Sequence, residues 1–142
     1  MTKNNVQCKL KTCIRHPYCW IHAKKILNLI VKKSTIENAG CGLFTTADIR
    51  KDAKICEYEG EILHKQINEN SQYTMKLKHN LFIDATCLRG IGAMANAKKT
   101  LKACNAKLTT NNTRTKGFLK ATHNIKSGAE IFLYYGDTFS LK

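Results

Sequence analysis

The sequence predicts a mostly β domain with little helix, and three observations favour this fold class. From Leu27 onward, short apolar runs alternate with turn residues, and many of these runs are shorter than eight residues. Strand-like and helix-like segments do not alternate along the chain, as they would in a parallel sheet with crossover helices. The chain has 142 residues, which suffices for one domain with a normal core and a small appendage.

Eight runs are expected to form the strands of this domain. They are residues 29–36, 43–46, 54–63, 73–78, 81–85, 106–110, 118–122 and 131–135. Turn candidates lie between them, at Gly40-Cys41-Gly42, His79-Asn80, Asn111-Asn112 and Ser127-Gly128. One short helical turn is expected around residues 93–99, and no internal repeat is present.

The first 26 residues differ from the rest and are expected to form a separate segment. Cysteine and histidine follow the spacing C-x4-C-x5-C-x2-H there, which gives the candidate ligands Cys8, Cys13, Cys19 and His22. Three thiolates and an imidazole suit tetrahedral zinc with every position filled by protein, which is a structural site. So short a segment lacks a core, and metal binding would supply its folding free energy. His16 is an alternative fourth ligand, and free thiols in a disordered basic tail are the competing interpretation.

Charge is unevenly distributed along this basic chain. The net charge is +14, residues 1–36 and 85–129 contain no acidic residue, and residues 48–69 hold six of the ten acids. Two basic surfaces are expected to flank an acidic one, and the basic surfaces suit contact with polyanions such as nucleic acid. A solvated basic protein without such a partner fits the charge equally well, because no aromatic-interleaved binding motif accompanies the lysines.

The cysteines and the apolar runs indicate an intracellular protein. Cys41, Cys56, Cys87 and Cys104 are scattered singly, which favours reduced thiols over a disulfide framework. No apolar run approaches the roughly 18 residues that a membrane-spanning helix needs. The lysine-rich N-terminus lacks the pattern of a secretory signal. We therefore expect a soluble chain that does not bind membranes.

Several motifs occur in series between residues 40 and 136. Gly40-Cys41-Gly42 lets the backbone approach a ligand closely, although alone it would indicate an ordinary turn. Tyr58-Glu59-Gly60-Glu61, Ile83-Asp84-Ala85, Asn96 and residues 130–136 follow it. Together these motifs resemble the SET-domain family of lysine methyltransferases, and especially the small stand-alone SET proteins of large DNA viruses. The resemblance covers residues 32–139.

The resemblance implies a SET domain over residues 27–142, after the zinc-binding segment of residues 1–26. The implied fold consists of short β-sheets with a C-terminal pseudoknot, in which the end of the chain threads under an earlier loop. The implied activity is methyl transfer from S-adenosylmethionine to lysine side chains of a protein substrate, with histones or nucleosomes expected. Small viral relatives suggest a homodimer, and a chromatin substrate suggests the host nucleus.

By the same resemblance, the site residues fall into three groups. Tyr135 takes the place of the catalytic tyrosine that positions the amine and the sulfonium, with Tyr73 beside it. The lysine channel is expected to be lined by Tyr58, Tyr73 and Leu133, and leucine at 133 leaves space for a second and third methyl group. The cofactor is expected to contact Gly40, Cys41, Gly42, Asn96, Ala97, Tyr135 and Phe139.

The chain departs from the family at one motif. Where relatives carry Arg-Phe-Ile-Asn-His, this chain has Ala93-Met94-Ala95-Asn96-Ala97 and keeps only the asparagine. A second interpretation therefore stays open, in which the zinc segment is a nucleic-acid or protein binding module and the methyltransferase core is impaired. A non-histone substrate protein of a virus or its host is a third.

Overall fold

The computed structural model describes residues 20–64, 73–87 and 89–134, and the structural statements below concern these residues. They are mostly β, as the sequence predicts. The strands are β1 (Leu29–Lys33), β2 (Cys41–Thr45), β3 (Lys54–Tyr58), β4 (Glu61–Leu63), β5 (Thr74–Lys78), β6 (Leu81–Asp84), β7 (Asn96–Ala97), β8 (Ala106–Thr110), β9 (Gly117–Ala121) and β10 (Glu130–Tyr134). Helical structure is confined to α1 (Trp20–Leu27) and two 3-10 turns, Ile91–Met94 and Leu101–Ala103.

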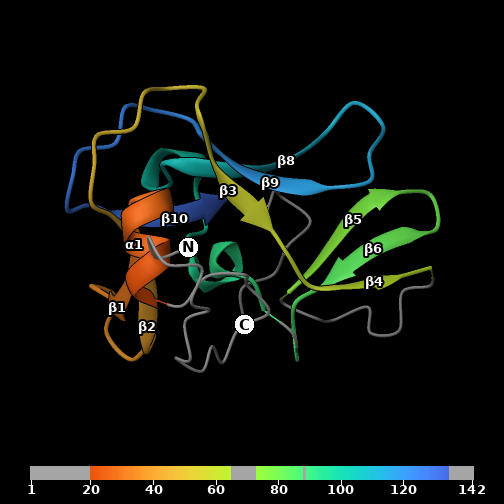
Figure 1. Cartoon of the computed structure of the whole chain (residues 1–142), viewed down its shortest axis with the longest axis horizontal. Coiled ribbons are helices and arrows are strands. Elements are labelled where there is room, and N and C mark those ends of the chain that lie inside the picture. Colours follow the sequence, from red (N-terminus) through yellow and green to blue (C-terminus); the bar gives the residue numbers. More distant parts are fainter. Residues whose placement is uncertain (1–19, 65–72, 88, 135–142) are drawn as a thin grey trace, which may run out of the picture.

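The strands form two sheets (Figure 1). The larger one has the order β1-β2-β10-β8-β9-β3, with β7 pairing to β10, and the smaller one has the order β4-β6-β5. β10 pairs antiparallel with β2 and parallel with both β7 and β8. β10 therefore joins segments that are far apart in sequence. The predicted C-terminal pseudoknot involves the chain after residue 134, which lies outside the described residues.

The core contains buried residues from both sheets. In β9 the buried residues alternate with half-exposed ones, the pattern of a strand with one buried face. Leu43, Leu119, Ile131 and Leu133 have no exposed surface. Each such side chain contributes about 1.5 to 3 kcal/mol through burial, so the association of β2, β9 and β10 is strongly favoured.

The expected strand over residues 54–63 is wrong, because it is two strands in different sheets. β3 pairs with β9 in the larger sheet, whereas β4 pairs with β6 in the smaller one. The break falls at Gly60, where a Cβ atom would lie 2.5 Å from the carbonyl oxygen of Asp84. Only glycine permits this close approach of two backbone segments, and the chain changes sheets there.

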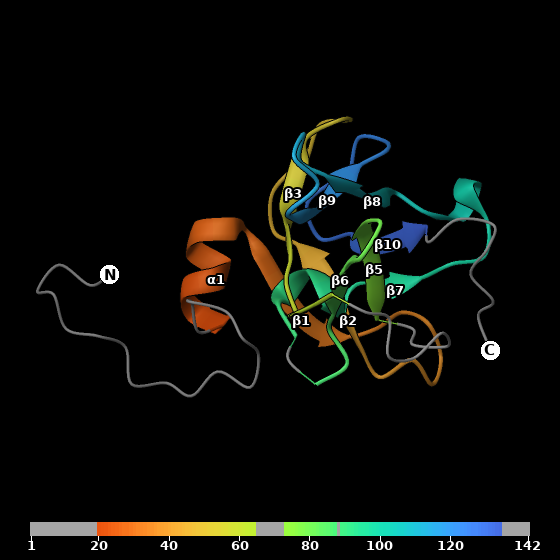
Figure 2. The same cartoon turned by 90° about the vertical axis from the view of Figure 1, so that its right-hand side faces the viewer.

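Helix α1 was not expected from the sequence, which assigned its first residues to the metal-binding segment. It packs against β1 (Figure 2). Ala23 is buried in the core, while Ile21 and Ile26 are exposed. Apolar residues on both faces weaken the helical periodicity, so the pattern gave no clear signal. The helix ends at Asn28, whose φ of 54° is a left-handed conformation that asparagine tolerates. In the described part of the chain, no helix has the length and apolar character needed to cross a bilayer.

Candidate functional site

The loop between β1 and β2 carries the Gly-x-Gly motif. Gly40 has a φ of +71°, and its carbonyl oxygen accepts a hydrogen bond of 2.8 Å from the backbone N–H of Ser34. No atom lies within 4 Å of the position that a Gly40 side chain would take. Cys41 is exposed, and Gly42 is buried. The hydrogen bond between Ser34 and Gly40 thus closes the loop, and the free space beside Gly40 would let a ligand approach its backbone.

Glu130 is the buried acid at the start of β10, and it lies behind this loop. Its Oε1 atom accepts hydrogen bonds from Ser34 Oγ at 2.7 Å and from Asn96 Nδ2 at 3.3 Å. Its Oε2 atom accepts from the backbone N–H of Thr35 at 2.8 Å and from Thr35 Oγ1 at 2.5 Å. Four neutral donors thus serve one carboxylate that is 6% exposed.

These donors decide the charge of Glu130. Burial alone would raise the pKa of the carboxyl, because it disfavours the ionised form. The hydrogen bonds from Thr35, Ser34 and Asn96 outweigh that effect and lower the pKa of Glu130 below its usual value. The carboxylate is therefore ionised at neutral pH, and its hydrogen bonds are of the stronger, charge-assisted kind.

Gly42 leaves the space that the Glu130 carboxylate occupies. A Cβ atom at position 42 would lie 2.9 Å from Glu130 Cδ and 3.2 Å from Asn96 Nδ2. Even the smallest side chain would displace the carboxylate or the loop. The two glycines therefore have different physical roles, one in backbone conformation and the other in close packing.

Asn96 connects the third motif to the same point. Its Nδ2 atom lies 3.0 Å from the carbonyl oxygen of Cys41 and 3.1 Å from Ser34 Oγ, in addition to its contact with Glu130. Asn96 and Ala97 form β7, which pairs with Phe132 and Leu133 of β10. We call Ser34, Thr35, Gly42, Asn96 and Glu130 the carboxylate cluster. It joins segments near residues 34–42, 96 and 130 into one rigid unit.

Asn105 holds β10 from the β8 side. Its Nδ2 donates to the Glu130 carbonyl at 2.8 Å, and its Oδ1 accepts from the Phe132 N–H at 2.9 Å. Its backbone N–H also donates to the Phe132 carbonyl at 3.2 Å. These bonds fix β10 on both sides of Ile131, and they keep Glu130 in register with the loop.

The residues expected to line a lysine channel lie between the two sheets and in the core. Tyr58 is 1% exposed, and its hydroxyl donates to the Tyr73 carbonyl at 3.0 Å. The Tyr73 ring is half-buried, and Cζ of the Arg89 guanidinium lies 3.8 Å from the centroid of this ring. Leu133 is fully buried. Tyr58 thus holds the backbone of Tyr73, while Tyr73 is the more accessible of the two rings.

Part of the expected site lies outside the described residues. This applies to the catalytic candidate Tyr135, to Phe139, and to the zinc ligand candidates Cys8, Cys13 and Cys19, as well as to His16. His22 is described and lies half-buried in α1. Among the residues that the structure describes, no group of three histidine, cysteine or acidic residues is arranged to hold a metal.

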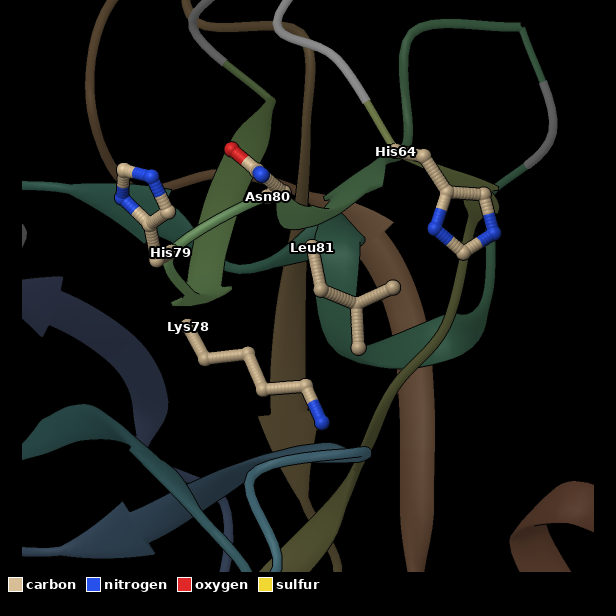
Figure 3. A pocket seen from close by; sticks show the side chains of 5 residues that line it. All are labelled: His64, Lys78, His79, Asn80 and Leu81. Atoms are coloured by element: carbon tan, nitrogen blue, oxygen red, sulfur yellow. The ribbon is translucent and has the colours of Figure 1, made fainter.

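A separate hollow of about 480 Å³ lies at the turn between β5 and β6. It is lined by His64, Lys78, His79, Asn80 and Leu81 (Figure 3). The two imidazole rings stand on opposite sides of the hollow and do not converge. Among the described residues, it shares none with the carboxylate cluster.

Sequence reasoning missed the hydrogen bonds of Ser34 and Thr35 with Glu130, although Glu130 belongs to the motif of residues 130–136. Residues 34 and 35 were expected to extend a strand, but β1 ends at Lys33 and both residues turn toward Glu130. One signal was available. Glu130 interrupts an otherwise apolar run, and an acid buried by such a run needs donors. Its partners Ser34 and Thr35, which lie about 95 residues earlier, carry no recognisable pattern.

Comparison with known proteins supports the same family as the motifs. The SET domain family model matches residues 40–136, which is most of the chain. No curated protein matches this chain.

Among solved structures, ctPRC2 in complex with H3K27me3 and H3K27M has a TM-score of 0.65 at 24% identity, over 80% of this chain and 15% of that one. ctPRC2 in an autoinhibited conformation bound to S-adenosylmethionine has a TM-score of 0.62 at 25% identity, over 78% and 15%. The polycomb repressive complex 2 of Chaetomium thermophilum has a TM-score of 0.61 at 23% identity, over 78% and 15%.

The chain therefore corresponds to about 15% of the length of these structural relatives. The likeness shows the fold. The family match covers every element of the carboxylate cluster except the turn at Ser34 and Thr35, and it includes the Gly-x-Gly loop, Asn96 and β10. On this basis the chain belongs to the SET-domain family.

Proposed function

We propose that this chain transfers methyl groups from S-adenosylmethionine to lysine side chains of a protein, with histones as the substrate. SET domains are protein-lysine methyltransferases, and the family match covers residues 40–136. The observation that carries the proposal is the convergence of three motifs on Glu130. The Gly-x-Gly loop, Asn96 and β10 meet there through hydrogen bonds of 2.5 to 3.3 Å. Because this backbone is already ordered, little conformational entropy would be lost when a ligand binds.

The cofactor would be held by backbone groups. Gly40 leaves open space on its exposed side, and the exposed Cys41 lies next to it. Gly40, Cys41 and Gly42, with Asn96 and Ala97 of β7, are the described residues that we assign to the cofactor. Tyr135 and Phe139 complete this set in our proposal. One structural relative, at 25% identity, is bound to S-adenosylmethionine, which supports the choice of cofactor.

The departure at residues 93–97 is compatible with this assignment. The side chain of Asn96 is engaged with Ser34, Cys41 and Glu130, so its amide stabilises the loop. Ala97 retains backbone groups that would bind an adenine edge, although the imidazole, the arginine and the bulky residues of the family motif are absent from residues 93–97. A reduced cofactor affinity, rather than loss of binding, is the expected consequence.

The chain itself would align and desolvate the substrate lysine. The cofactor supplies an electrophilic methyl group, and the amine that attacks it must be neutral. Because a free lysine has a pKa of about 10.4, a narrow apolar channel would favour the neutral form. Tyr73 and Leu133 would line this channel, and the buried Tyr58 would fix Tyr73 through its hydroxyl. Tyr135 would position the amine, and leucine at 133 leaves space for up to three methyl groups.

Two features support a histone substrate. One structural relative is in complex with H3K27me3 and H3K27M. In this chain, Glu57 lies in β3, Glu61 begins β4 and Glu59 lies between the two strands, which gives an acidic stretch suited to a basic peptide. The nucleosome is the preferred form, because the net charge of +14 would repel an isolated histone tail. A nuclear location and a homodimer are parts of this proposal that follow from the resemblance.

The zinc site remains part of the proposal. Cys8, Cys13 and Cys19 would bind the metal together with His22, with His16 as the alternative. His22 is half-buried in the first turn of α1, and α1 packs against β1. A metal bound to His22 would therefore tie the preceding segment to the SET domain.

Methyl transfer from labelled S-adenosylmethionine to nucleosomes and core histones tests the proposal. We expect label on a lysine with the native protein, none with Tyr135→Phe, and near-native label with Tyr134→Phe, which removes a neighbouring hydroxyl. Mass spectrometry of the product counts the methyl groups, with up to three expected. Absence of transfer together with absence of calorimetric cofactor binding would contradict the proposal. It would favour a binding module, which the altered residues Ala93, Ala95 and Ala97 also fit.

A further inference from the structure

The outer face of the larger sheet carries three lysines in a single row. Lys54 of β3 pairs directly with Lys120 of β9, and Lys120 pairs directly with Lys107 of β8. The three strands lie side by side in Figure 1. Ala106 and Ala121 pair with each other and are fully buried. Lys107 and Lys120 are their chain neighbours, and successive side chains of a strand alternate between faces, so these lysines point away from the core. We call Lys54, Lys107 and Lys120 the lysine row.

The row is unfavourable for the isolated fold. Side chains directly opposite each other in antiparallel strands have Cβ atoms about 4.5 to 5.5 Å apart, and like charges in such pairs are destabilising. No acidic residue lies opposite a member of the row in the strand pairing. The Lys54 ammonium lies 3.8 Å from the Phe118 ring centroid. This cation–π contact attracts the ammonium, but the ring carries no negative charge that would neutralise it. Any polar residue would satisfy the fold at these positions.

The surroundings of the row are suited to phosphate groups. Lys54 and Lys120 border a hollow of about 280 Å³ that also contains Thr109, Thr110 and Asn111. Hydroxyl and amide groups beside lysines are the usual donors to phosphate oxygens. Asp52 is the one acid among the described residues that line the hollow, and the whole of residues 85–129 contains no acid. The face is therefore basic over the complete β8–β9 hairpin.

The hairpin loop adds two cations in an ordered arrangement. Asn111 Oδ1 accepts hydrogen bonds from the backbone N–H groups of Thr115 and Lys116 at 2.8 and 3.0 Å. The backbone N–H of Arg114 donates to the Asn111 carbonyl at 3.0 Å. The loop is thus closed on itself and presents Arg114 and Lys116 as exposed side chains at the end of the same hairpin.

We propose that this face binds the phosphate backbone of double-stranded DNA, independently of sequence and of methyl transfer. Neighbouring strands are about 4.8 Å apart, so the three lysines span roughly 10 Å. Phosphates along one DNA strand advance about 3.4 Å each along the axis, so the row is about as long as three such steps. Binding would relieve the repulsion within the row. It would also overcome the conflict between a basic chain and a basic histone, because the nucleosome presents DNA.

The test measures binding of a fluorescent 30-base-pair DNA of arbitrary sequence to the full chain, over a series of salt concentrations. Lys54, Lys107 and Lys120 are changed together to glutamine. The matched control changes Lys24, Lys25 and Lys76, which are exposed on α1 and β5, so that both variants lose three charges. Thermal unfolding of both variants is recorded, and the row variant should be at least as stable as the native chain because its repulsion is removed.

We expect the row variant to bind DNA on the order of tenfold or more weakly at 0.1 M salt. Its slope of log K against log salt should be smaller by about 2.7, which is 0.9 for each lost phosphate contact. The control should keep the native slope. If both variants lost DNA affinity equally, net charge alone would explain the binding and the proposal would be overturned. It would also be overturned if the native chain did not bind DNA. Displacement of DNA by polyglutamate at equal charge would instead identify the face as a site for acidic proteins.

Discussion

Gly42 of β2 and Glu130 of β10 are packed so closely that a side chain at position 42 would overlap the carboxylate. The carboxylate occupies the space where a Gly42 side chain would lie, and a Cβ there would be 2.9 Å from Glu130 Cδ. Because Glu130 is also bonded to Ser34, Thr35 and Asn96, the Gly-x-Gly loop has one position relative to β10. The geometry of the Gly-x-Gly loop is thus fixed by its hydrogen bonds to a buried carboxylate.

The two glycines of the loop should respond differently to alanine. Gly40→Ala places a side chain in open space but at a φ of +71°, which costs about 1 to 2 kcal/mol of unfolding free energy. Gly42→Ala collides with Glu130, and such overpacking typically costs about 1 to 3 kcal/mol. Calorimetry should find cofactor binding weakened in the first variant and lost in the second. Normal binding by Gly42→Ala would show that the loop does not depend on this contact.

Glu130→Gln should destabilise the protein by about 1 to 3 kcal/mol at pH 7, because an amide nitrogen would then face the donors of Thr35 or Ser34. The pKa of Glu130 is lowered in the folded state, so its stabilising contribution is present above the pKa of about 4.3 of an unfolded glutamate. That contribution is lost as the pH falls through the lower folded pKa. Urea unfolding between pH 7 and pH 3 should therefore show a steeper loss for the native chain than for Glu130→Gln. Parallel curves would mean that the pKa of Glu130 does not differ between the folded and unfolded states.

Tyr58→Phe should cost about 0.5 to 1.5 kcal/mol of unfolding free energy, because it leaves the Tyr73 carbonyl without the hydroxyl donor at 3.0 Å. Since Tyr58 fixes Tyr73, the KM for a peptide substrate should rise while the cofactor affinity stays the same. Tyr134→Phe, on a half-exposed strand end, serves as the control for both measurements. A changed cofactor affinity would place Tyr58 nearer to the cofactor than proposed.

The fold was predictable where the local pattern decides it. Residues 106–110 form a strand with the expected bounds, because the apolar pattern and the turn at Asn111 agree. The break at Gly60 was not predictable, since it depends on the backbone of Asp84, which is distant in sequence. The motifs identified Gly40, Gly42 and Asn96, but the role of Glu130 depends on Thr35, 95 residues away. A single sequence contains no record of such pairings.

Zinc should be present at about one ion per chain in protein purified without chelator. Three thiolates and one imidazole bind zinc tightly enough to fold a short segment. Removal of zinc should therefore expose residues before α1 to proteolysis, while the β-sheet signal of residues 27–134 is largely retained. Cys13→Ser should reproduce this effect, whereas Cys87→Ser, at an exposed free thiol, should not. Absence of zinc by elemental analysis would leave the free-thiol interpretation.

The cysteines offer a test of the cofactor site that does not require a substrate. Cys41 and Cys87 are exposed, whereas Cys56 is buried and its pKa is raised to about 12 by desolvation and by the nearby Glu59 and Glu57. A thiol reagent at pH 8 should therefore modify Cys41 and Cys87 but leave Cys56 intact, because the thiolate is the reactive form. S-adenosylmethionine should slow modification of Cys41 and not of Cys87, as read by peptide mass spectrometry. If both cysteines react at the same rate with and without the cofactor, the Gly-x-Gly loop is not where it binds.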